Sequence, residues 1–307
     1  MMLRVLVALL LPAASLFARV HLACAGGVDG VLDPAYGPAR TVQSTQTTMK
    51  GYPSSEINFC LGTELDGGYA YVADGTLHLL LAGNLSLWWT LEGVTQWKRI
   101  DIFIDSKPGG QNRMLGNNPT LDPFYDLKNM TGLTFDSGFE ADYWLSLGSN
   151  NYGYPKLYAY YAELPSGGGG SGAFLGTTLC GGPGALSGGT NPFGFQATVN
   201  DSNTAGVSAG CGAASGANVG TGVEWAIPLA AIGSPLGCIK VCAFVSRADH
   251  AIVFNQVLGP LPPGTCDLGA VSAVNFSTIA GDQFFSICDA STPTRGLSWG
   301  RLKSIYR

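Results

Sequence analysis

Strand-length runs of apolar, β-branched and aromatic residues recur along this chain of 307 residues, and turn signals separate them. The 44 glycines and 17 prolines argue against long helices, because both residues destabilise helix interiors. The runs do not alternate with helix-length segments, as they would around a parallel sheet. The sequence therefore predicts an all-β fold, a two-sheet antiparallel β-sandwich of the jelly-roll or Greek-key kind. The expected strands are 70–73, 77–85, 99–105, 142–147, 157–163, 195–199, 223–227, 239–245 and 251–258, with one short helical turn at 229–232.

The N-terminus has the pattern of a secretory signal peptide. Arg4 precedes an apolar stretch at 5–18, and the small-residue step A-C-A follows at 23–25. This stretch is short for a membrane span, and no later apolar run is long enough to be one. We therefore predict a signal peptide at 1–25 and export to the extracellular space or the cell surface. The alternative, a lipoprotein acylated on Cys24, lacks the small aliphatic residue that such signals place three positions earlier.

The cysteines favour a disulfide framework. Eight cysteines less Cys24 leave seven, so in an oxidising compartment we expect up to three disulfides and one free thiol. The disulfide that we favour joins Cys180 to Cys211, because each flanks a glycine-rich stretch that a cross-link would stabilise by about 2–4 kcal/mol. A zinc site at Cys238 and Cys242 is disfavoured, because they lie in an expected strand with no second cysteine or histidine pair nearby. The seven are Cys60, Cys180, Cys211, Cys238, Cys242, Cys266 and Cys288.

One segment interrupts the strand pattern within an expected domain at 26–290, and another follows that domain. The glycine-rich, charge-poor stretch 165–222 is interpreted as a long loop or irregular insertion on the sandwich, and the alternative is a linker between two domains. The last segment, 291–307, is a small basic amphipathic tail. Its basic residues are Arg295, Arg301, Lys303 and Arg307.

Composition also limits the function. Sixteen Lys and Arg against 21 Asp and Glu give a net charge of −5, so nucleic acid is not expected as a partner. Only three histidines occur: His21 in the predicted signal peptide, His78 inside an apolar strand, and His250 in an expected solvated turn. Asp101 and Asp105 share one face of a strand, but paired acids at strand ends more often cap turns than catalyse. We therefore expect no enzyme.

Sugar binding needs fewer groups. Flat aromatic faces stack on sugar rings while amides and carboxylates hydrogen-bond the hydroxyls. Trp144 and Trp225 alternate within expected strands and are assigned to the core. The candidate ligand-binding residues on expected loops are Trp88, Trp89, Trp97, Asn112, Tyr125, Tyr152 and Tyr154, with Asn117 and Asn118 as further polar partners.

A structural calcium ion is the one cofactor that the sequence suggests. Calcium takes oxygen ligands that loops can supply, and acidic residues gather in the expected turns around 105 and 136–142. The alternative is that these side chains satisfy the backbone of their own turns. The candidate metal residues are Asp105, Asp136, Glu140 and Asp142.

Four phrases carry a resemblance to a known family. They are D-G-V-L-D at 29–33, D-G-T-L-H-L at 74–79, I-D-I-F-I-D at 100–105 and V-E-W-A-I-P-L at 223–229. Together they resemble the family 9 carbohydrate-binding module and the related DOMON superfamily, which implies a β-sandwich and carbohydrate binding. The chain also looks like glycine-rich secreted bacterial proteins whose C-terminal tails are read by sorting machinery. The segment 297–307 stands where such a tail would be; alternatively it is a basic helix that docks or frays.

These observations lead to one interpretation and one alternative. We expect a secreted, non-catalytic binding module, with carbohydrate at the cell surface or in the extracellular matrix as its partner. The alternative is a structural envelope or matrix protein in which the glycine-rich segment and an unpaired cysteine mediate self-association.

Overall fold

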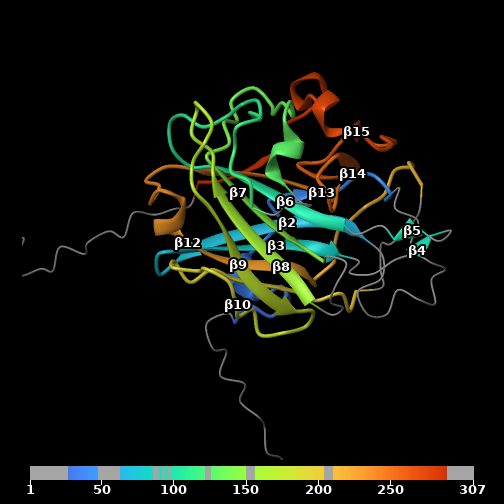
Figure 1. Cartoon of the computed structure of the whole chain (residues 1–307). Coiled ribbons are helices and arrows are strands. Elements are labelled where there is room, and N and C mark those ends of the chain that lie inside the picture. Colours follow the sequence, from blue (N-terminus) through green and yellow to red (C-terminus); the bar gives the residue numbers. More distant parts are fainter. Residues whose placement is uncertain are drawn as a thin grey trace, which may run out of the picture.

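The computed structural model describes residues 27–47, 63–85, 90–91, 94–95, 98–121, 126–149, 156–203 and 210–288. In these residues two antiparallel sheets pack face to face, and the only helices are single 3-10 turns (Figure 1). The predicted all-β, two-sheet sandwich is confirmed. No helix in the described part of the chain is long and apolar enough to cross a membrane.

The smaller sheet has five strands in the order β1-β2-β3-β12-β11, and the larger sheet has nine in the order β10-β9-β8-β7-β6-β13-β14-β15, with β16 paired to β13. The five are β1 Thr41–Val42, β2 Glu64–Ala73, β3 Thr76–Asn84, β12 Gly222–Pro228 and β11 Gln196–Val199. The larger sheet contains β10 Ser187–Gly188, β9 Gly172–Leu179, β8 Lys156–Glu163, β7 Tyr143–Gly148, β6 Lys98–Asp105, β13 Ile239–Arg247, β14 Ile252–Leu258, β15 Gly269–Ala270 and β16 Phe285–Ile287. A separate pair joins β4 Thr90–Leu91 to β5 Val94–Thr95. The 3-10 turns are η1 Pro34–Tyr36, η2 Leu127–Met130, η3 Leu229–Ile232, η4 Val271–Ala273 and η5 Phe276–Thr278.

The hairpin β2–β3 forms where the sequence predicts it. Its two-residue turn is Asp74-Gly75, with φ of 47° and 75°. Positive φ at both central positions is the requirement of the turn that matches strand twist, and Asp-Gly meets it at little cost. Strands β6, β7, β8, β11, β12, β13 and β14 and the turn η3 also lie at the predicted places, within a few residues at their ends.

Both faces of the larger sheet are buried over its central strands β6, β7 and β13. Ile100, Ile102 and Ile104 of β6 face the smaller sheet in the main core, while Phe103 and Trp144 face the other way. Side chains from the segments 106–141 and 259–284 cover that outer face and form a second apolar cluster. The outer face of β6 is therefore buried although it carries Arg99 and Asp101 as well as Phe103.

The N-terminal segment covers part of the outer face of the smaller sheet. The carboxylate of Glu224 on β12 accepts hydrogen bonds from the backbone N–H groups of Asp29 and Gly30, at 2.8 and 2.7 Å, and from the Tyr36 hydroxyl at 2.7 Å. Gly30 has φ of 75°, and a Cβ there would lie 2.8 Å from the carbonyl oxygen of Gly222. The D-G-V-L-D phrase therefore has a structural role: it joins this segment to the sheet.

The glycine-rich stretch contains more strand than the sequence predicts. Besides the expected β11 it contributes β9 and β10, and β9 pairs with β8 along most of its length. Leu175 of β9 and Phe195 pack in the main core, as part of the sandwich. Composition hides β9, because glycine has low strand propensity while its backbone still forms the ladder hydrogen bonds.

The predicted Cys180–Cys211 disulfide is wrong. Cys211 is bonded to Cys266, with 4.9 Å between the Cα atoms, and Cys238 is bonded to Cys288, with 4.1 Å. Cys180 is disulfide-bonded as well, but to none of these four cysteines. Two cysteines that flank a glycine-rich stretch need not lie close together. Cys211 instead packs against the segment after β14, which contains Cys266. Cys242 is free and buried, which agrees with one expected unpaired thiol.

Candidate functional site

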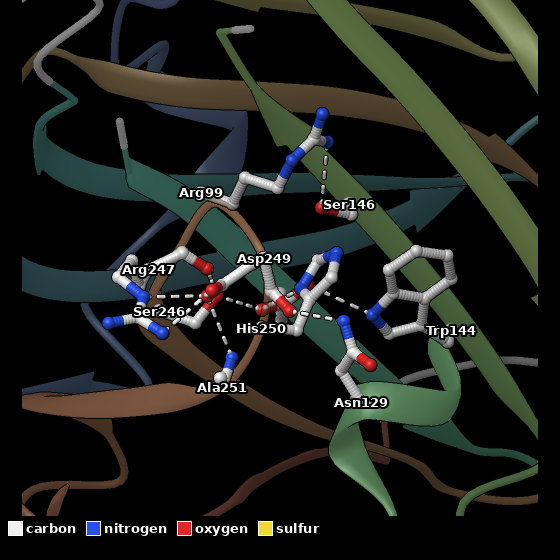
Figure 2. A network of polar contacts seen from close by, with 10 residues as sticks. Arg99, Asn129, Trp144, Ser146, Ser246, Arg247, Asp249, His250 and Ala251 are labelled. Carbon is white, nitrogen blue, oxygen red and sulfur yellow. Dashed lines mark hydrogen bonds and ion pairs between the residues drawn. The ribbon is translucent and has the colours of Figure 1, made fainter. Parts of the chain in front are cut away.

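A buried polar network lies between the larger sheet and the segments that cover it. Asp101 of β6 is fully buried, and its carboxylate accepts hydrogen bonds from the Trp144 indole N–H at 3.0 Å and the Ser246 hydroxyl at 2.5 Å. The Nδ1 atom of His250 lies 3.1 Å from the same carboxylate. Arg99 extends this network toward Ser146, with 3.3 Å between Nη1 and Oγ (Figure 2).

His250 is not in the solvated turn that the sequence predicts. The turn between β13 and β14 bends inward at His250, where φ is 60°, and its side chain is 0% exposed. The ring lies edge-on to Trp144, with 5.4 Å between centroids. Asn129 of η2 donates a hydrogen bond to the backbone carbonyl of Asp249 and holds the turn against the covering layer. The neighbouring Arg247–Asp249 ion pair, drawn in Figure 2, is partly exposed.

The network resembles an acid–histidine dyad, but its geometry is that of a structural contact. Burial raises the pKa of the Asp101 carboxyl, and the contacts with His250, Ser246 and Arg99 outweigh this, so the pKa falls below its ordinary value. Ser246 donates to Asp101 and makes no contact with His250 that would activate a nucleophile. The Nε2 atom of His250 is buried without a hydrogen-bond partner. The network therefore holds the β13–β14 turn against β6 and β7.

A partly exposed aromatic patch occupies the β8–β9 end of the outer face of the larger sheet. We define the aromatic patch as Tyr158, Tyr160 and Phe174. The rings of Tyr158 and Phe174 have centroids 6.1 Å apart and are inclined by 30°, and Tyr160 lies 5.3 Å from Phe174. The Arg99 guanidinium lies 4.9 Å from the centroid of Tyr160. Tyr158 and Phe174 are partly exposed, whereas Tyr160 is buried.

Sequence reasoning missed this patch, although a signal for it exists. Tyr158 and Tyr160 are two residues apart in a predicted strand, which places both side chains on the same face. Leu157, Ala159 and Tyr161 alternate with them and face the main core. The partner ring of Phe174 comes from β9, which the sequence does not reveal.

Of the predicted ligand-binding residues only Asn112 lies in the described part of the chain. Its side-chain amide donates to the backbone carbonyls of Asp136 and Phe139, at 2.9 and 2.8 Å, and so organises the covering segment. Asn118 is buried and paired with Gln111. The remaining candidates, Trp88, Trp89, Trp97, Tyr125, Tyr152 and Tyr154, lie outside the described residues, as do the signal peptide and the basic tail.

The four predicted metal residues lie in neighbouring turns, where three of them accept hydrogen bonds from protein groups. Asp105 accepts from Lys240 Nζ at 2.9 Å, and Asp142 accepts from the backbone N–H groups that follow Asp105. Asp136 accepts from the backbone of 283, and Glu140 is exposed. Burial raises the pKa values of Asp136 and Asp142. Within the described ranges, no group of three acidic, histidine or cysteine residues is placed to hold a metal ion.

A groove of about 700 Å³ adjoins these turns. Its lining includes Asp105, Glu140, Lys107 and Lys240, so it carries both signs of charge, and Leu236 at its rim is 85% exposed. Asp105 and Lys240 already pair with each other. No aromatic side chain is among the described residues that line it, so it offers no stacking surface for a sugar ring.

Comparison with known proteins gives no match: no family model, no curated protein and no solved structure is similar to this chain. The resemblance to family 9 carbohydrate-binding modules therefore stays a prediction. The function has to be argued from the geometry above.

Proposed function

We propose that this chain is a secreted, non-catalytic binding module for carbohydrate, and that the aromatic patch is part of its binding surface. The observation that carries the proposal is the pair of partly exposed rings, Tyr158 and Phe174, side by side on adjacent strands. Aromatic faces stack on the apolar faces of sugar rings, and tyrosine adds a hydroxyl that can hydrogen-bond a sugar hydroxyl.

The surroundings of the patch suit this use. Thr177 of β9 lies opposite Tyr158 in the strand register and is partly exposed, so a hydroxyl group borders the rings. Both strands belong to the larger sheet, and Tyr160 anchors the patch against Arg99. Rings held by paired strands lose little conformational freedom on binding, which favours affinity at a small surface.

A non-catalytic function is the simpler proposal for the described residues. The Asp101–His250 contact is the one acid–histidine contact within them, and both side chains are 0% exposed. A substrate could reach it only after the covering segments opened. Export agrees with the disulfides, which persist in oxidising compartments.

The test is polysaccharide binding by wild type and by Tyr158→Ala and Phe174→Ala, measured on a glycan array and by affinity electrophoresis. We expect at least tenfold weaker binding for each variant, because a stacked ring contributes about 1.5–3 kcal/mol through its buried area. Tyr71→Ala is the matched control: Tyr71 is also partly exposed and stacks on His78 at 4.5 Å, but on the outer face of the smaller sheet. Its binding should match wild type.

Two results contradict the proposal. Binding that survives both patch substitutions would exclude the aromatic patch as the surface. Absence of any glycan ligand, together with concentration-dependent oligomers in sedimentation experiments, would favour the structural matrix protein instead.

A further inference from the structure

Three buried oxygen-bearing side chains lie together at the end of the β2–β3 hairpin that is remote from its turn. They are Glu64 and Asp66 of β2 and Asn84 of β3, with exposures of 2%, 1% and 1%. None of them takes part in the polar network at Asp101 or in the aromatic patch. Their position belongs to the smaller sheet and is separate from the acidic turns around 105 and 136–142.

The strand register brings Glu64 and Asn84 to one face. They are direct cross-strand partners, and such partners share a face with Cβ atoms about 4.5–5.5 Å apart. A bulge between Leu65 and Gly67 inserts Asp66 as an extra residue next to this pair. The charge of Asp66 acts on Glu64, so the two carboxylates lie close together.

Each of the three side chains has a buried oxygen that accepts no hydrogen bond: Oε2 of Glu64, Oδ2 of Asp66 and Oδ1 of Asn84. The amide nitrogen of Asn84 donates to the carbonyl of Asn203 at 3.0 Å, which leaves its oxygen as the free end. Leaving a buried acceptor unpaired is costly, and more so for a carboxylate.

We propose that Glu64, Asp66 and Asn84 form a site for a calcium-type divalent cation that ties the open end of the β2–β3 hairpin together. Hard cations bind carboxylate and amide oxygens, and calcium accepts irregular arrangements of six to eight such ligands, completed by backbone carbonyls or water. Because one of its three side chains is an amide, this site is not a group of three acidic, histidine or cysteine residues, and the described residues contain no such group placed to hold a metal ion. The cation supplies the partner that all three oxygens lack.

The experiment uses full-length protein stripped with EDTA and titrated with calcium chloride, with binding followed by isothermal titration calorimetry and stability by thermal melting. Wild type is expected to bind about one ion, with a Kd of about 10⁻⁴ M or lower for a site with two carboxylates. At a calcium concentration 100 times the Kd, its melting temperature should rise by about 5–10 °C. Glu64→Gln and Asn84→Leu should each weaken binding at least tenfold.

Asp142→Asn is the matched control. Asp142 is another buried acid with an unpaired oxygen, Oδ1, but it precedes β7 in the larger sheet and accepts hydrogen bonds from the backbone of 106 and 107. Its calcium affinity should equal that of wild type. Stripped wild type that takes up no calcium in the titration overturns the proposal even if the variants fail to fold. Binding that survives Glu64→Gln and is lost in Glu140→Gln would also overturn it, since the ion would then lie at the acidic turns.

Discussion

Replacing Asp101 by alanine should destabilise the protein by about 4 kcal/mol. The change leaves three buried donors without their acceptor: the indole N–H of Trp144, the hydroxyl of Ser246 and Nδ1 of His250. Each unpaired buried group costs about 1–3 kcal/mol, and these losses are not additive because the three donors surround one small space. Removing one partner of a buried ion pair costs about 3–5 kcal/mol, and the predicted loss of about 4 kcal/mol lies in this range.

The assay is urea unfolding followed by tryptophan fluorescence, in which Trp144 itself reports on the region. If the midpoint urea concentration falls while the slope of unfolding free energy against urea concentration is unchanged, the variant has lost stability without a change in its unfolded state. Arg247→Ala is the control, because the Arg247–Asp249 pair is more than a third exposed and should contribute at most about 1 kcal/mol, while Asp249 keeps its hydrogen bond from the backbone N–H of Ala251. If Asp101→Ala lost less than about 1 kcal/mol, the network would not hold the β13–β14 turn and the reasoning would be refuted.

The same carboxylate predicts a pH dependence. The pKa of Asp101 is lowered on folding, so its ionised form stabilises the native state fully above the unfolded pKa of about 3.9. This contribution disappears as the pH falls through the lower, folded pKa. The difference in unfolding free energy between wild type and Asp101→Asn should therefore be constant from pH 5 to 7 and shrink below about pH 4. A difference that stayed constant down to pH 2 would contradict the assignment.

Three further changes test the framework. Replacing Cys211 and Cys266 by serine removes their disulfide. For a separation of 55 residues the chain-entropy model predicts a loss of about 4 kcal/mol. Urea unfolding of oxidised wild type and of the variant measures this loss, and the difference between them should shrink under reducing conditions. Gly30→Ala should destabilise by more than about 1 kcal/mol in the same assay, because φ is 75° and the added Cβ would meet backbone at 2.8 Å; a neutral result would deny the close approach. Glu224→Gln should cost about 1–3 kcal/mol and speed hydrogen exchange at 29–36, and unchanged exchange would show that the carboxylate does not hold this segment.

The central strands of both sheets could be predicted because their signal is local. The apolar run of β3 and the Asp-Gly turn before it indicate a hairpin from a few neighbouring residues. The 3-10 turn after Pro228 is local as well. By contrast, β1, β15 and β16 are two or three residues long and exist only because a longer strand is beside them.

The parts of the site that sequence reasoning missed depend on contacts between distant residues. Asp101 and His250 are 149 residues apart, and no local pattern indicates that the turn at 250 bends inward. The covering segments at 106–141 and 259–284 contain few strands, yet they supply the apolar layer that buries it. The disulfides follow the same rule, because Cys211 meets Cys266 only after β14 has been placed.

The segments that cover the outer faces of the two sheets also limit where this protein can bind a partner. The N-terminal segment covers part of the outer face of the smaller sheet, and the segments 106–141 and 259–284 cover the larger sheet over β6, β7 and β13. Among the described strands of the larger sheet, β8 and β9 keep rings partly exposed on its outer face. Under the proposed function each ring would contribute only a few kcal/mol, so a patch with two partly exposed rings would give modest affinity for a single chain of sugars. Strong attachment to a polysaccharide would then require many copies side by side, which is how a weak binding module would function on a repetitive polymer.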